Sequence, residues 1–152
     1  MQFLNNYSNR ELNIWAELIL DILVSFYFFP KIFPLIIDGQ LYSEALVGII
    51  ANTIIIAIIY SISVFGAINT LTKREEKDER DYIYELKSYR VSNIISQVSI
   101  YLLISLIVFN PINQVRLNEF TAPMIAMLLL IITLLSSTGK SLTQLFNYRK
   151  NI

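Results

Sequence analysis

The sequence contains neither cysteine nor histidine. It therefore cannot form disulfides or use a thiolate nucleophile, and it lacks the ligands of most zinc sites. Only four glycines occur in 152 residues, which leaves little scope for a glycine-rich nucleotide-binding loop. Neither a paired-carboxylate motif nor a recognisable setting for a serine nucleophile is present. We therefore expect a protein that is not an enzyme and that holds no cofactor or metal ion.

Apolar side chains are what the sequence has in excess. They make up 55% of the residues, and the mean hydropathy is +0.54, which is more than one soluble domain of this size can bury. The formal net charge is zero, so overall charge gives no reason to expect nucleic acid as a partner. The composition predicts a single membrane domain over residues 1–152, with the lipid bilayer as its solvent.

The apolar residues are concentrated in four stretches, each close to the roughly 20 residues that cross a bilayer core. The predicted spans are residues 15–37, 45–68, 92–110 and 120–139. The first is read as a retained span, because no basic run precedes it and no small-residue cleavage site follows it. We expect Pro30 and Pro34 to kink or end this helix near its far side. The predicted fold class is all-α, an integral membrane four-helix bundle.

The lysine and arginine residues lie almost entirely on one side of these spans. Only Lys31 and Arg116 fall on the opposite side. Positively charged flanks stay in the cytoplasm, so both termini and the loop at residues 70–91 are expected there, in a multi-pass protein of the cell (inner) membrane. The residues on the cytoplasmic side are Arg10, Lys73, Arg74, Lys77, Arg80, Lys87, Arg90, Lys140, Arg149 and Lys150.

The long loop between the second and third spans has the pattern of a helix. No glycine or proline interrupts it, so residues 73–91 are expected to form a cytoplasmic helix continuous with the third span. Tyr82, Leu86 and Tyr89, with Ile83 beside them, give this helix an apolar face that can contact a partner. The partner could be the membrane surface, another loop, a second subunit or a cytoplasmic protein. The alternative is a solvated, charge-rich helix that contacts nothing.

A short motif leads into the third span. It consists of Asp78, Glu79, Arg80 and Asp81, followed by Ile83, Glu85, Lys87, Arg90 and Ser92. Together with Trp15 at the start of the first span, these residues resemble the signature of uncharacterised small bacterial and archaeal four-span membrane proteins. The resemblance covers residues 78–92 and the topology, and it implies a fold but no activity and no functional residues.

Polar residues inside the predicted spans are the candidate site. Glu17, Asp21 and Ser25 are spaced by four residues on the first helix, and ionisable groups at membrane depth usually face the protein interior. No lysine or arginine lies within the predicted spans at the depth of Asp21, so its carboxyl group is expected to be protonated or hydrated. The full set of intramembrane candidates is Glu17, Asp21, Asn52, Ser61, Gln97 and Thr133, with Ser63, Ser96 and Ser136 at similar depth.

Two interpretations of these polar residues remain open. In the first, they hydrogen-bond one another between helices in a shared layer, as polar groups in membrane proteins commonly do. In the second, Asp21 titrates or binds a cation in a water-accessible cavity. The tail at residues 140–152 mixes apolar and basic residues, and it is expected to form a short helix lying at the inner interface.

Three functions are compatible with this sequence. The preferred one is a non-enzymatic membrane protein that assembles as a homo-oligomer or binds a partner through its spans and its cytoplasmic helix. The second is a small transporter or channel subunit that uses Asp21. In size and span number the chain is similar to small multidrug transporters, although its cytoplasmic loop is longer than theirs and their helix signatures are missing. The third is a membrane-perturbing stress or defence effector.

Overall fold

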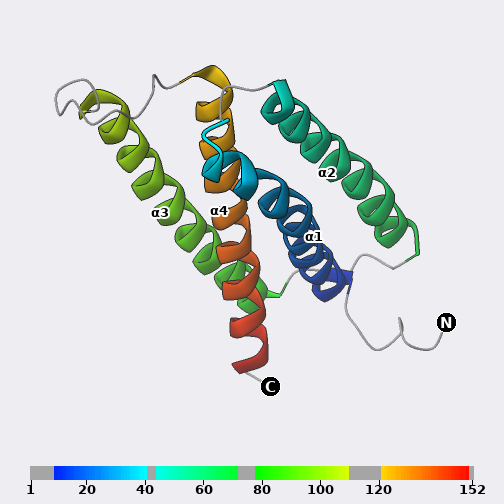
Figure 1. The fold of residues 1–152 in the computed structure, drawn as a ribbon. Coiled ribbons are helices and arrows are strands. Elements are labelled where there is room, and N and C mark those ends of the chain that lie inside the picture. Colours follow the sequence, from blue (N-terminus) through cyan, green and yellow to red (C-terminus); the bar gives the residue numbers. More distant parts are fainter. Residues whose placement is uncertain (1–8, 41–43, 72–77, 110–120, 151–152) are drawn as a thin grey trace.

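The computed structural model describes residues 9–40, 44–71, 78–109 and 121–150. These residues form helices α1 (Asn9–Ile37), α2 (Glu44–Leu71), α3 (Glu79–Phe109) and α4 (Ala122–Lys150). Each of the four is long and apolar enough to cross a membrane (Figure 1). The predicted all-helical class with four membrane-spanning helices is therefore confirmed.

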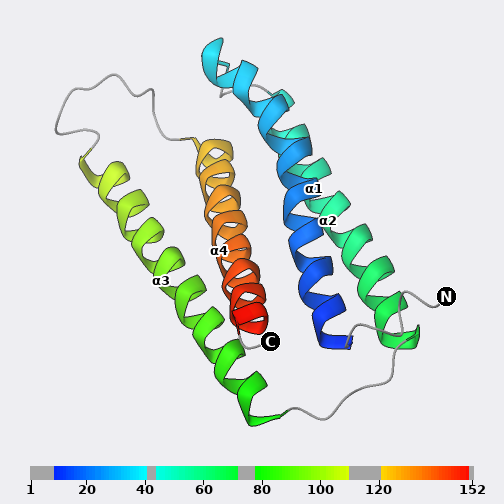
Figure 2. The same ribbon diagram turned by 90° about the horizontal axis from the view of Figure 1, so that it is seen from below.

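The helices form an open arrangement in which α1 and α4 are central. In the described part of the chain, α2 packs mainly against α1, and α3 packs along α4 (Figure 2). The order across the molecule is α3, α4, α1, α2, and the backbones of α2 and α3 do not approach one another in the described ranges. The bundle is consequently not closed into a ring, and α3 forms one edge of the molecule.

Helix α1 continues through both of its prolines to Ile37. Of the two outcomes expected at these prolines, a kink or an end, an end is therefore excluded, and the helix stops at residue 37, where the predicted span ends. Phe28 and Ile32, on either side of Pro30 in sequence, are buried in the largest apolar core cluster. A proline inside a helix removes one hydrogen-bond donor and crowds the preceding turn, but its fixed φ is compatible with the helix. The burial of Phe28 and Ile32 contributes to keeping this segment helical.

A glycine turn ends α1. Gly39 has a φ of 66°, which is the left-handed conformation that glycine adopts without a steric penalty. Its N–H bonds to the carbonyl of Ile36 at 3.3 Å, and the N–H of Gln40 bonds to the carbonyl of Leu35 at 2.9 Å. These two bonds make the Schellman cap, which satisfies carbonyl groups left free at a helix end.

Helix α4 extends well beyond the predicted end of its span. The tail was expected to lie at the membrane interface as a separate short helix, but residues 140–150 continue α4 as far as Lys150. Leu145 and Tyr148 pack against Ile14, Leu18 and Trp15 of α1. The tail is thus the last part of α4 and not a separate helix, and one of its sides packs against α1.

Helix α3 joins the charged segment to the third span without a break between Glu79 and Phe109. Residues 73–77, which were expected to begin this helix, lie outside the described residues. Asp78 precedes the helix and acts as its cap, because its Oδ1 accepts a hydrogen bond of 2.7 Å from the N–H of Glu79. In return, Asp81 Oδ2 accepts a bond of 3.1 Å from the N–H of Asp78. Part of the Asp78–Asp81 motif therefore serves to start the helix.

Candidate functional site

Three helices are joined at the end of the molecule that carries Asn9 and Lys150. Arg10 of α1 forms an ion pair with Asp81 of α3, and each side chain is 20% exposed. Tyr148 of α4 donates a hydrogen bond of 2.6 Å to Asp81 Oδ1, and Arg10 Nη1 donates one of 3.5 Å to Tyr148 Oη. We call Arg10, Asp81 and Tyr148 the terminal cluster. Since its members come from three helices, it fixes where α3 sits against α1 and α4.

An ion pair lies further along the same helices. Lys140 Nζ of α4 donates to both carboxylate oxygens of Glu17, at 2.8 and 3.1 Å. The same ammonium lies 5.1 Å from the centre of the Tyr89 ring. Lys140 reaches Glu17, which lies one helical turn from Asp21 on α1, because α4 remains helical beyond Gly139.

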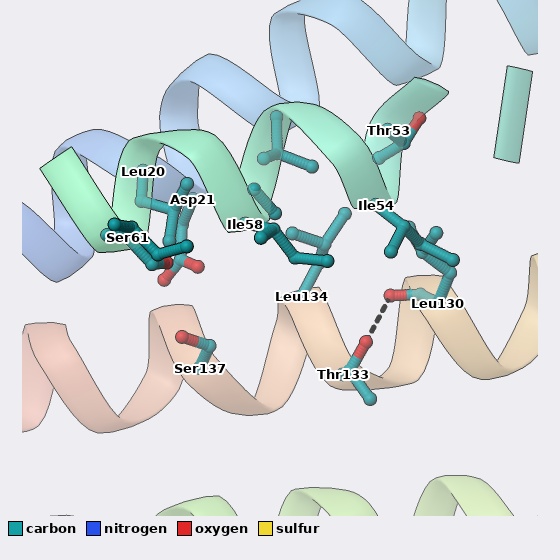
Figure 3. A pocket seen from close by; sticks show the side chains of 13 residues that line it. Leu20, Asp21, Thr53, Ile54, Ile58, Ser61, Leu130, Thr133, Leu134 and Ser137 are labelled. Carbon is teal, nitrogen blue, oxygen red and sulfur yellow. Dashed lines mark hydrogen bonds between the residues drawn. The ribbon is translucent and has the colours of Figure 1, made fainter. Parts of the chain in front are cut away.

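Asp21 lines a cavity of about 440 Å³ between α1, α2 and α4 (Figure 3). Its side chain is buried, with the residue 5% exposed, and Thr138 Oγ1 lies 3.4 Å from its Oδ2. Thr138 also donates a shorter hydrogen bond, of 2.8 Å, to the carbonyl of Leu134. The Asp21 carboxylate also accepts a hydrogen bond from the hydroxyl of Ser137, so it has two hydroxyl donors, of which Thr138 is the weaker. The polar side chains lining the cavity are Asp21, Thr53, Ser61, Thr133 and Ser137, and all other lining residues are apolar.

A second polar group links α3 to α4. Ser136 Oγ lies 2.6 Å from Ser92 Oγ, accepts a hydrogen bond of 2.8 Å from Ser96 Oγ, and lies 3.0 Å from the carbonyl of Ser92. Close by, the backbone of Gly139 approaches α3 so closely that a Cβ there would lie 2.5 Å from Ile95 Cδ1. The shared polar layer expected from the sequence is thus divided into the Asp21 cavity and this serine cluster.

The predicted intramembrane residues have different positions. Ser61 and Thr133 line the cavity with Asp21, and Glu17 lies one turn away. Asn52 and Gln97, by contrast, are exposed on α2 and α3 and do not line it. Sequence reasoning missed Ser137 and Thr138. Their signal was the run of small hydroxyl residues from Ser136 to Thr138, placed just before Lys140.

The predicted partner-contact residues lie on one exposed face of α3. Tyr82, Ile83, Leu86 and Tyr89 are between 50% and 65% exposed. The other side of the same segment carries Asp81 of the terminal cluster, the ring of Tyr84 against Tyr148, and the fully buried Ser88. The apolar face of this segment is therefore largely exposed, with the Tyr89 ring at its edge, 5.1 Å from Lys140 Nζ of α4.

The described residues contain no group of acidic side chains placed to hold a metal ion. No protein-family model, no curated protein and no solved structure matches the chain. The class that the fold defines is that of an all-helical protein with four helices able to span a membrane. The features that bear on function are therefore the Asp21 cavity, the serine cluster and the exposed face of α3.

Proposed function

We propose that this chain is a non-enzymatic integral membrane protein that self-assembles or binds a partner through its spans and through α3. Both termini and the start of α3 lie in the cytoplasm, in keeping with the distribution of lysine and arginine. The observation that carries the proposal is the exposed apolar face formed by Tyr82, Ile83, Leu86 and Tyr89.

The terminal cluster fixes which side of α3 is exposed. Asp81 bonds Arg10 and Tyr148, so the polar side of the segment is already committed to α1 and α4. The segment cannot rotate to bury its apolar side without breaking these bonds. Contiguous apolar surface that remains in water marks contact sites. The helix is therefore held in place with its contact surface outward.

The proposal is tested by replacing Tyr82, Leu86 and Tyr89 together with serine in the full chain, reconstituted in nanodiscs. The parent protein is expected to have the mass of an assembly, either of several copies or with a co-purified partner, and the variant that of one chain. A matched control replaces Arg80 and Lys87, exposed charged residues of the same helix, with serine. An unchanged assembly in the triple variant, or a parent that is a lone monomer, contradicts the proposal.

A second candidate function is a small transporter or channel subunit, and the cavity favours it. A carboxylate that faces a cavity open to solvent or lipid can bind and release a proton or cation, whereas one enclosed by donors cannot do so easily. Asp21 has that position, among the hydroxyl groups of Ser61, Thr133 and Ser137. Flux through liposomes that is lost in an Asp21→Asn variant would establish this function. Absence of any proton or cation flux in the parent protein would remove it.

A further inference from the structure

The exposed face of α3 continues from the charged segment into the membrane-spanning part. Positions separated by eleven residues recur along it: Tyr82 with Asn93, and Leu86 with Gln97. All members of this row are exposed. We call it the α3 seam, and it consists of Tyr82, Leu86, Tyr89, Asn93, Gln97, Ile100 and Ile104.

The spacing makes the seam a straight strip. An eleven-residue repeat corresponds to about 3.67 residues per turn, close to the period of an α-helix, so its members stay on one side along the whole helix. A second helix can therefore lie against the seam over its full length with little supercoiling. Helix α4 lies against the adjacent side of α3, where Ser92 and Ser96 bond Ser136, and it reaches the seam only at its edge, where Lys140 Nζ lies 5.1 Å from the Tyr89 ring.

Two amides of the seam lie at membrane depth. The 31 residues of α3 span roughly 46 Å, more than the ~30 Å of a bilayer core. With Phe109 at the far boundary, Asn93 and Gln97 lie about 6 and 12 Å inside the core. Lipid offers no partner for their donors and acceptors, so exposure of these groups to lipid is costly. A carboxamide both donates and accepts, which makes it complementary to another copy of itself.

The charged residues beside the seam also favour a second copy of this chain as the partner. Glu85 and Arg90 flank the seam on opposite sides, five residues apart. In two parallel helices related by a two-fold axis, this spacing sets Glu85 of each copy against Arg90 of the other. Copies of one chain insert in one orientation, given the bias of lysine and arginine, so their α3 helices are parallel.

We infer that α3 pairs in parallel with α3 of a second copy of this chain, with the seam as the contact. The amides of Asn93 and Gln97 bond across the axis inside the membrane, and Glu85 and Arg90 pair at its inner boundary. This inference rests on the proposed function and narrows its partner to a second copy.

The absence of cysteine from the sequence allows a direct test in the full chain, because each introduced thiol is unique. Leu86→Cys and Ile100→Cys place a thiol on the seam, and Lys87→Cys and Val98→Cys place one at matched depth on another exposed side of α3. Mild oxidation in native membranes should link the two seam variants into dimers, at yields at least fivefold above those of the two controls. Equal yields at all four positions, or none in a protein that still forms oligomers, would overturn the pairing while leaving self-assembly standing. A protein that is monomeric and bound to a different chain would likewise overturn the pairing alone. A lone monomer would overturn both.

Charge exchange gives an independent test. Glu85→Arg or Arg90→Glu alone should lower the yield of the Ile100→Cys disulfide, because each places like charges opposite one another. The double exchange should restore it. Replacing Asn93 and Gln97 together with leucine should weaken dimerisation roughly tenfold, as expected for loss of a few interhelical hydrogen bonds. Failure of the double exchange to restore the yield, or a leucine variant that dimerises as well as the parent, would count against the seam.

Discussion

Tyr148 of α4 donates a hydrogen bond of 2.6 Å to Asp81 of α3, across 67 positions of sequence. The same carboxylate pairs with Arg10 of α1. One acidic residue of the charged segment is thus the common partner of the first and last helices. The position of the α3 seam depends on this contact, since it decides which side of α3 faces outward.

We predict that Tyr148→Phe lowers the free energy of unfolding by about 1 kcal/mol, the usual cost of losing one hydrogen bond. Asp81→Ala should cost more, because it removes the partner of both Arg10 and Tyr148, although partial exposure limits the contribution of the ion pair. Thermal unfolding in detergent measures both effects. Tyr101→Phe, at an exposed tyrosine of α3, is the control and should leave stability unchanged.

Gly139 provides a prediction about close packing. A Cβ at this position would lie 2.5 Å from Ile95 Cδ1, the far end of a side chain that can change rotamer, so Gly139→Ala should destabilise the contact between α3 and α4 by about 1 kcal/mol. Adding Ile95→Ala removes the clashing atom and should recover part of the loss. Gly66→Ala, where a Cβ meets nothing within 4 Å, should be neutral or stabilising. Equal effects of the two glycine substitutions would show that α3 and α4 are not packed this closely.

Asp21 distinguishes a structural role from transport. Asp21→Asn should keep the assembly intact, whereas Asp21→Leu should cost more stability, because it removes the acceptor of the Ser137 hydroxyl. If transport takes place, both variants should lose a pH-dependent flux in liposomes, since neither side chain titrates. Thr133→Val, which alters the cavity lining but keeps both Asp21 and Ser137, is the control. Flux that persists in Asp21→Asn would exclude this residue as the carrier.

The orientation of the chain is open to direct measurement. Reporters fused after Ile152 and inserted within residues 73–77 should read cytoplasmic, whereas one inserted near Gly39 should read external. The first two positions follow the basic flanks of the spans, and the third lies between α1 and α2. A cytoplasmic signal near Gly39 would contradict the topology and, with it, the depth assigned to Asn93 and Gln97.

Local sequence rules predicted the helices but not which residues of one helix contact which residues of another. Four apolar stretches of sufficient length were enough to predict four spanning helices, because only a helix satisfies its own backbone in lipid. The absence of glycine and proline correctly indicated that α3 would be unbroken from Glu79 onward. At Pro30 and Pro34 the choice between a kink and an end was left open by the sequence, and the helix continues to Ile37 with Phe28 and Ile32 packed in an apolar cluster.

Contacts between helices were not predictable in the same way. Lys140 was placed in a cytoplasmic flank, and its pairing with Glu17 depends on α4 staying helical past Gly139 and on the side that it turns toward α1. Likewise, Asp81 was part of a motif with no assigned role, and its partners are at residues 10 and 148. Such pairs depend on how the helices are rotated and tilted, which a single sequence does not specify.

The polar contacts between helices described above lie toward one end of the molecule, and this asymmetry affects how the membrane acts on the fold. The end near Asn9 and Lys150 is joined by the terminal cluster, the Glu17–Lys140 pair and the serine cluster. The opposite end is held by the apolar contacts of Phe28, Ile32, Leu46 and Met127. Lipid chains can replace apolar contacts at nearly equal free energy, but they cannot replace ion pairs or hydrogen bonds. When the bilayer is stretched or thinned, the helix ends near Ile37 and Ala122 should therefore move apart first. The ends near Asn9 and Lys150 should stay joined by their polar contacts.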